Sequence, residues 1–185
     1  MKLFFLTFVI LLISCSPHFK TQRTIALINI NDFRAVTLTK DTTNAIPQKG
    51  SKTVVVFANN NACNACFGYV GNYLQPFLSD SGIQVVAFCR VGTHSLSRRS
   101  LINSFAYLMP QVKSFYFDIQ DTSSLLIPKE GLFATLNIKY TPALLIWDNQ
   151  LRKTELFLPY SELIQKPDGS VKPAAKKKIA KILHE

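Results

Sequence analysis

Cys63 and Cys66 have the residue type and the spacing to do chemistry. Two thiols separated by two residues can close a small-ring disulfide, or they can share a metal ion. A structural zinc site needs four ligands, usually two such pairs or one pair with two histidines. The other candidate ligands are not spaced as a second pair: His18, Cys89, His94 and His184. The pair therefore favours thiol–disulfide chemistry, and neither a metal nor an organic cofactor is expected.

The pair lies between an expected strand and an expected helix. The preceding run TVVVFA (53–58) is continuous and rich in β-branched residues, which is typical of a buried central strand. From Cys63 to about Leu78 the apolar residues follow helical spacing, and Pro76 should kink or end that helix. Because free N–H groups and the dipole at a helix amino terminus stabilise a thiolate, Cys63 is the expected nucleophile. Cys66, one turn along, is placed to resolve a mixed disulfide, and a static structural disulfide is the alternative.

Strand and helix patterns alternate along the rest of the chain. Further strands are predicted over 83–88, 114–119, 143–147 and 151–158, and further helices over 97–108 and 132–136. Two runs, 24–30 and 34–38, indicate a short amino-terminal strand pair, and the polar segment 41–51 indicates a loop. The alternation followed by a hairpin predicts an α/β domain with a mixed sheet flanked by helices.

A second signal is the tripeptide Tyr140-Thr141-Pro142, which directly precedes the expected strand 143–147. With it, the order strand, CxxC, helix, strand, helix, strand and Thr-Pro before a hairpin resembles the thioredoxin fold. Within that fold, the chain is most similar to the membrane-tethered thioredoxin-like and redoxin group, over about residues 50–165. The resemblance is carried by the CxxC pair, FYFDIQD (115–121) and GLFATLNIKYTPALLIWDNQLRK (131–153).

The resemblance implies roles for four residues. Cys63 and Cys66 correspond to the family's first and second redox cysteines. The peptide bond between Thr141 and Pro142 is expected to be cis and to face them. The backbone of Thr141 is then expected to pair with a bound substrate chain, so Thr141 and Pro142 form the expected substrate-binding loop.

The chain departs from the family pattern near the cysteines. Ala62 stands where members usually have Trp, and the pair encloses Asn-Ala where many members have a Pro. Phe57 stands where thioredoxins proper bury an acid, which bears on proton transfer and on the direction of exchange. The peroxidase branch is disfavoured because neither cysteine has Thr three residues before it. The copper-chaperone branch is disfavoured because it uses a wider cysteine spacing together with a histidine.

The amino terminus resembles a bacterial lipoprotein signal. Met1 and Lys2 give a positive start, and the apolar run 3–13 is too short to span a bilayer but has the length of a signal-peptide core. In such proteins the chain is cut before a cysteine, here Cys15, which then carries acyl chains. Such an anchored protein faces the periplasm or the cell surface of the bacterial envelope, where disulfides persist. The expected division is a signal peptide (1–14), a lipidated tether (15–23), a thioredoxin-like domain (24–165) and a basic tail or helix (166–185).

The formal net charge of the 185-residue chain is +10, and much of it gathers in the carboxyl-terminal tail. Residues 166–185 contain six lysines against Asp168 and Glu185. We expect a basic helix over 173–183 that packs on the sheet, with attraction to anionic lipid headgroups as the functional alternative. Nucleic acid is not an expected partner of an exported chain whose charge lies in one tail.

These features support two hypotheses. The first is a lipid-anchored thiol:disulfide oxidoreductase that reduces disulfides of exported proteins through Cys63 and Cys66, fed by a membrane electron donor. The second is a surface lipoprotein whose thioredoxin-like domain binds a partner and whose disulfide is a static staple. Cys89, after the strand 83–88, is expected to be a small buried hydrophobe, and a third redox thiol beside Arg90 is the alternative.

Overall fold

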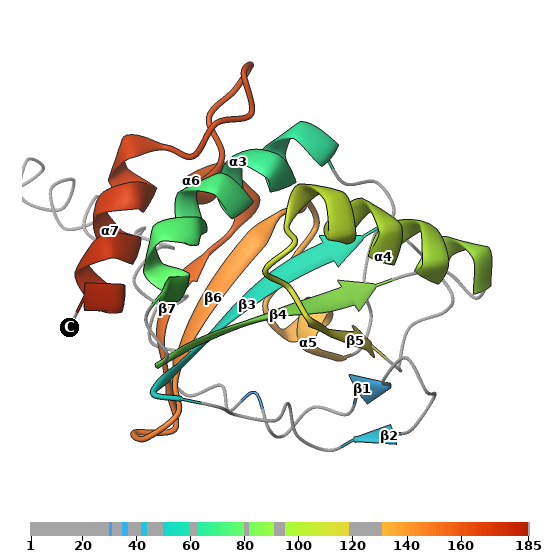
Figure 1. Cartoon of the computed structure of the whole chain (residues 1–185), viewed down its shortest axis with the longest axis horizontal. Coiled ribbons are helices and arrows are strands. Elements are labelled where there is room, and N and C mark those ends of the chain that lie inside the picture. The colour runs from blue at the N-terminus through green and yellow to red at the C-terminus, as the bar shows by residue number, and fades with distance from the viewer. Residues whose placement is uncertain are drawn as a thin grey trace, which may run out of the picture.

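The computed structural model describes residues 30, 35–36, 42–43, 50–59, 63–79, 82–90, 95–118 and 131–184 (Figure 1). The expected signal peptide, Cys15 and the tether 16–23 lie outside these described residues, as do His18 and His94. Within the described ranges, no helix combines the length and the apolar character needed to cross a membrane.

A mixed β-sheet forms the centre of the molecule, in the strand order β2-β1-β5-β4-β3-β6-β7 (Figure 1). Its central strands β3, β4 and β5 run parallel, whereas β6 and β7 form an antiparallel hairpin beside β3. The predicted α/β domain with a mixed sheet and a closing hairpin is therefore confirmed. The strands are β1 (Ala35–Val36), β2 (Thr42–Thr43), β3 (Lys52–Asn59), β4 (Ile83–Arg90), β5 (Ser114–Asp118), β6 (Ala143–Asp148) and β7 (Lys153–Leu158).

The amino-terminal strand extension differs in part from the prediction. Ala35–Val36 forms β1 within the run 34–38, but its hairpin partner is β2 at Thr42–Thr43, inside the segment expected to be a loop. Ile30 has a 3-10 conformation rather than an extended one, and residues 24–29 lie outside the described part of the chain. A nearby segment can pair with β1 at little loop-closure cost, and two β-branched threonines suit an edge strand.

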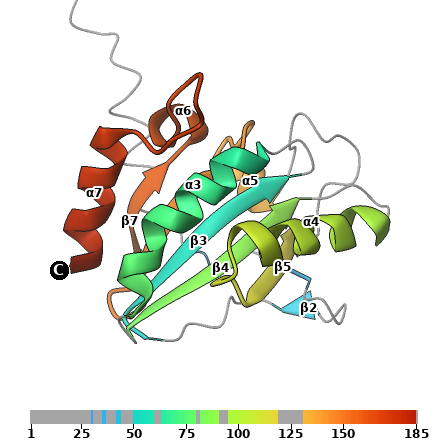
Figure 2. The ribbon, with the colours of Figure 1, turned by 45° about the horizontal axis from the view of Figure 1, so that its top comes forward.

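Helices cover both faces of the sheet (Figures 1 and 2). On one face, α3, α4 and α7 share a buried apolar cluster with alternate residues of the central strands. On the other face, α5 packs with Ile30 and Trp147. The helices are α3 (Asn64–Leu74), α4 (Ser95–Leu108), α5 (Gly131–Thr135), α6 (Tyr160–Leu163) and α7 (Pro173–His184).

The end of α3 and the formation of α7 both follow from local sequence. The α-helix that begins at the CxxC pair ends at Leu74, and the chain continues as the 3-10 helix η3 (Gln75–Ser79). Pro76 lacks an N–H and cannot extend an α-helix, so the predicted break is confirmed. The basic helix predicted over 173–183 forms as α7, which buries Ala175 and Ile179 against the sheet.

The residues of β3 divide between the two faces, as the alternation of a strand requires. Val54, Val56 and Ala58 lie in the cluster on the α3 side of the sheet. Val55 and Phe57 lie in the cluster on the α5 side, where the Phe57 ring packs edge-on against Phe133 at 5.5 Å between centroids. Neither face of β3 therefore brings a carboxyl group toward the helix that carries the cysteines.

Candidate functional site

Cys63 is the N-cap of α3, and it is joined to Cys66 by a disulfide with an S–S distance of 2.12 Å. Its backbone is extended (φ −71°, ψ 102°), and its Sγ accepts a hydrogen bond from the N–H of Cys66 at 3.2 Å. The side chain of Cys63 is half-buried, whereas only 1% of Cys66 is exposed. The sulfur at the helix amino terminus is thus the accessible one, and its partner lies in the apolar cluster beneath it.

The predicted cis peptide between Thr141 and Pro142 is present, directly before β6. The hydroxyl of Thr141 donates to Oδ1 of Asn59 at 2.9 Å and accepts the N–H of Asn59 at 3.3 Å. Asn59 is the last residue of β3, four positions before Cys63, so these bonds brace the cis loop against the strand that leads to the cysteines. Because the buried hydroxyl is engaged in this way, any contact of Thr141 with a substrate chain must come from its backbone.

Two further residues contact the disulfide, and both come from the chain after β7. The hydroxyl of Tyr160, at the start of α6, lies 3.9 Å from Sγ of Cys66. A Cβ atom built on Gly169 would lie 3.1 Å from Sγ of Cys66 and 3.9 Å from Sγ of Cys63. Gly169 has φ +78°, a left-handed conformation that favours glycine.

The loop that carries Gly169 is closed by its own hydrogen bonds. The N–H of Gly169 donates to the carbonyl of Gln165 at 2.9 Å, and the N–H of Gln165 donates to the carbonyl of Ser170 at 2.8 Å. The segment 166–185 was predicted only as a basic tail or helix, and its contact with the cysteines was not predicted. The tripeptide Pro167-Asp168-Gly169 is a turn signal that predicts the loop, although it does not predict what the loop packs against.

Cys89 is not part of this constellation. It lies fully buried in β4 within the cluster on the α3 side of the sheet, and this burial raises the pKa of its thiol. Neighbouring strand residues point to opposite faces, so Arg90 does not stabilise a Cys89 thiolate from the same side. The residue fits the expected role of a small buried hydrophobe. In the described ranges, no three His, Cys, Asp or Glu side chains gather as a metal-binding group.

The sequence matches no family model and no curated protein. The structure is similar to a secreted disulfide oxidoreductase of Mycobacterium tuberculosis homologous to E. coli DsbE, with a TM-score of 0.51 and 13% identity over 83% of this chain and 96% of that chain. It is similar to a thioredoxin-like protein of Porphyromonas gingivalis, with a TM-score of 0.54 and 11% identity over 82% of this chain and 88% of that chain. Copper-bound yeast Sco1 gives a TM-score of 0.51 and 11% identity over 83% of this chain and 87% of that chain.

These likenesses show that the chain has an α/β thioredoxin-like fold. The fold places a CxxC disulfide at the start of α3, and structural neighbours of the chain include thiol–disulfide oxidoreductases. The same fold also carries copper in one of the similar proteins. The chemistry of this chain must therefore be argued from its own site, since a fold hosts several functions.

Proposed function

We propose that the protein is a thiol:disulfide oxidoreductase of the bacterial cell envelope, which reduces disulfides in exported proteins. One contact carries the proposal above all: the half-buried sulfur of Cys63 accepts the N–H of Cys66 at the amino terminus of α3. In the reduced protein the same N–H and the helix dipole favour a Cys63 thiolate.

The reaction proceeds in two exchanges. The Cys63 thiolate attacks a substrate disulfide, the Cys63–substrate bond forms as the substrate S–S bond breaks, and the released thiolate takes a proton from water. Cys66 then gives up its proton and attacks Sγ of Cys63, which forms the Cys63–Cys66 bond and frees the second substrate thiolate. The substrate gains two electrons and two protons. A dithiol donor in the membrane restores the reduced pair.

Tyr160 is the group that we propose to assist Cys66. Sγ of Cys66 is buried and must lose a proton before it attacks, and β3 offers it only apolar neighbours on the α3 side. The Tyr160 hydroxyl, 3.9 Å away, can hydrogen-bond the sulfur in either direction. It thus occupies the role that a buried acid holds in thioredoxins proper.

Replacing Tyr160 by Phe is expected to slow the second exchange. A hydrogen bond worth about 1 kcal/mol corresponds to about a fivefold loss of rate, because the Cys66 thiolate is stabilised less. Rapid-quench alkylation, which separates the mixed disulfide from the Cys63–Cys66 form, measures this step against pH. Tyr107→Phe is the matched control, since Tyr107 is 86% exposed and belongs to α4 rather than to the segment that contacts the disulfide. Equal resolution rates and equal pH profiles for the two variants would remove Tyr160 from the mechanism.

The reduction potential of the Cys63–Cys66 pair tests the direction of electron flow. Titration of the protein with glutathione, followed by alkylation of free thiols, is expected to give a reduction potential of about −270 mV, which is typical of a reductant such as thioredoxin. A potential above about −200 mV would instead indicate an oxidant or an isomerase. A pair that stays oxidised beyond about −300 mV would favour the static staple of a partner-binding lipoprotein.

The proposed location rests on the amino-terminal sequence. Cleavage before Cys15 and acylation of that residue would anchor the chain stably, because several acyl chains bind a bilayer far more tightly than one. Metabolic labelling with radioactive palmitate is expected to label the protein in its bacterial host and to leave Cys15→Ala unlabelled. Equal labelling of the two proteins would contradict the anchor, and it would leave the redox proposal intact.

A further inference from the structure

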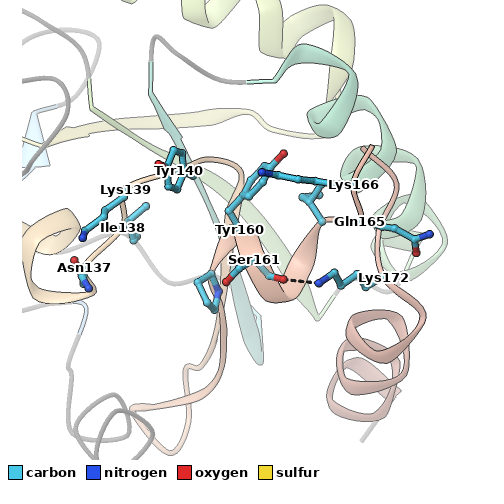
Figure 3. A pocket seen from close by; sticks show the side chains of 11 residues that line it. Asn137, Ile138, Lys139, Tyr140, Tyr160, Ser161, Gln165, Lys166 and Lys172 are labelled. Carbon is cyan, nitrogen blue, oxygen red and sulfur yellow. Dashed lines mark hydrogen bonds between the residues drawn. The ribbon is translucent and has the colours of Figure 1, made fainter. Parts of the chain in front are cut away.

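A groove lies between the segment that leads to the cis peptide and the α6 segment (Figure 3). Its volume is about 730 Å³. One wall comes from the chain before the cis peptide, and the other comes from α6 and the loop that follows it. Tyr160 lines the groove, and its hydroxyl lies 3.9 Å from Sγ of Cys66, so this one residue links the groove to the disulfide.

Two tyrosines form the aromatic part of this groove. Tyr140 directly precedes Thr141 and is 72% exposed, although it is a large aromatic side chain. Its ring centroid lies 6.2 Å from that of Tyr160. These two rings, which contact each other, provide an apolar surface on which a substrate chain can lie.

Three lysines give the groove its charge: Lys139, Lys166 and Lys172. Lys166 lies over the Tyr160 ring with Nζ 6.0 Å from the centroid, and Nζ of Lys172 donates to the carbonyl of Ser161 at 2.6 Å (Figure 3). No aspartate or glutamate lines the groove, and none of the three lysines forms an ion pair with a described acidic side chain.

Two acidic side chains in the same stretch of chain, Glu162 and Asp168, have other partners. The carboxylate of Asp168 accepts the backbone N–H and the hydroxyl of Ser170. The carboxylate of Glu162 pairs with Lys178 at 3.3 Å. Among the described residues, the three groove lysines therefore keep their ammonium groups outside ion pairs and can meet an incoming carboxylate.

We propose that this groove binds an acidic segment of the substrate protein, a few residues from the cysteine under attack. The proposal rests on the oxidoreductase function above and names its substrate class: exported disulfides flanked by aspartate or glutamate. The lysines attract the carboxylates, and the tyrosines cover the intervening chain. A concave, aromatic-lined site beside a reactive sulfur suits a peptide better than the flat headgroup surface of a membrane.

Three peptide disulfides of equal ring size test the proposal. Their flanking residues are Glu, Gln or Lys on both sides, and the second-order rate of oxidation of the reduced protein is measured for each. At low ionic strength the Glu peptide is expected to react about tenfold faster than the Lys peptide. The difference in rate is expected to shrink in 0.5 M NaCl, because salt screens the charges: the Debye length falls from about 10 Å at 0.1 M to about 3 Å at 1 M.

Reversing the charge of groove lysines tests whether the peptide preference arises in the groove. Lys139→Glu with Lys166→Glu is expected to abolish or invert the preference for the Glu peptide. The matched control is Lys113→Glu with Lys177→Glu, which makes the same change of charge at exposed positions that do not line the groove. The control variant is expected to keep the preference.

The possible failures can be told apart. Equal rates for the three peptides at low salt would overturn the groove proposal while the oxidoreductase function stands. A cysteine pair that reacts neither with hydroxyethyl disulfide nor with any of the three peptides would overturn the oxidoreductase function. In that case, calorimetric titration with cysteine-free Glu and Lys peptides tests the groove alone. Equal affinities for these two peptides would overturn the groove proposal. The three peptides could also react at equal rates while only the groove variant loses binding to phosphatidylglycerol vesicles. That result would identify an anionic membrane surface, rather than a peptide, as the ligand of the groove.

Discussion

Cys66→Ala protein is expected to accumulate as a mixed disulfide between Cys63 and its substrate, with turnover reduced at least about a thousandfold. The physical reason is that the two sulfurs differ in their exposure to solvent. The half-buried Cys63 can meet a substrate, whereas Cys66 is 1% exposed and can reach only Sγ of Cys63. Without Cys66, the first exchange still occurs and the intermediate persists. Non-reducing electrophoresis and mass spectrometry of the trapped species measure the effect and identify the substrate.

Cys63→Ser is expected to show neither turnover nor the trapped species, because a serine hydroxyl does not attack a disulfide. Cys89→Ala is the matched control, since it removes a thiol that is fully buried within β4. The control is expected to retain normal exchange and to lose some stability from the small cavity. Full exchange activity in the Cys63→Ser variant would contradict the proposed role of Cys63 as the nucleophile.

Much of this site can be predicted from local sequence. The run TVVVFA marks β3, and the helical spacing after Cys63 marks α3, because both elements are specified by short-range periodicity. The Thr-Pro step before β6 is equally local. Pattern reasoning therefore finds both cysteines of the disulfide and the cis loop, and the pairing of β3 with β6 brings the end of β3 beside the cis loop.

The residues that complete the site depend on how distant segments pack. Tyr160 lies 94 positions after Cys66, and nothing in its local sequence distinguishes it from other tyrosines. The short helix α6 was not predicted, since four residues carry no clear period. The basic segment read as a tail supplies Gly169 and two of the groove lysines, because its loop folds back over the disulfide before α7 begins. Local signals such as Pro-Asp-Gly report a turn but not its neighbour.

β3 brings no carboxyl group toward Cys66, and this follows from the packing of the whole strand rather than from one aligned position. Phe57 points to the α5 side of the sheet, away from the cysteines. The α3 side of β3 carries Val54, Val56 and Ala58. β3 therefore brings no carboxyl group to the site, and the hydroxyl that lies 3.9 Å from Sγ of Cys66 comes from Tyr160.

Gly169→Ala is expected to lower the stability of the oxidised protein by about 1–2 kcal/mol, because the residue adopts φ +78° and L side chains disfavour that region. For a domain of this size the thermal midpoint should fall by about 2–8 °C. The new Cβ, 3.1 Å from Sγ of Cys66, adds a close contact and shields the disulfide, so exchange with a substrate should also slow. Circular dichroism measures the midpoint, and the rate of disulfide reduction by dithiothreitol measures the shielding.

Two companion variants separate backbone strain from the contact with sulfur. Gly169→Asn adds the same Cβ, but Asn tolerates the left-handed conformation better, so most of its remaining effect reports the contact. Gly68→Ala, inside α3, places a Cβ only 3.7 Å from Leu108 Cδ2, an ordinary contact, and should raise stability by about 0.5–1 kcal/mol. An unchanged midpoint and an unchanged reduction rate in Gly169→Ala would mean that this loop does not hold its place against the disulfide in solution. The groove beside it would then lose one of its walls, and the substrate preference proposed for its lysines would fail with it.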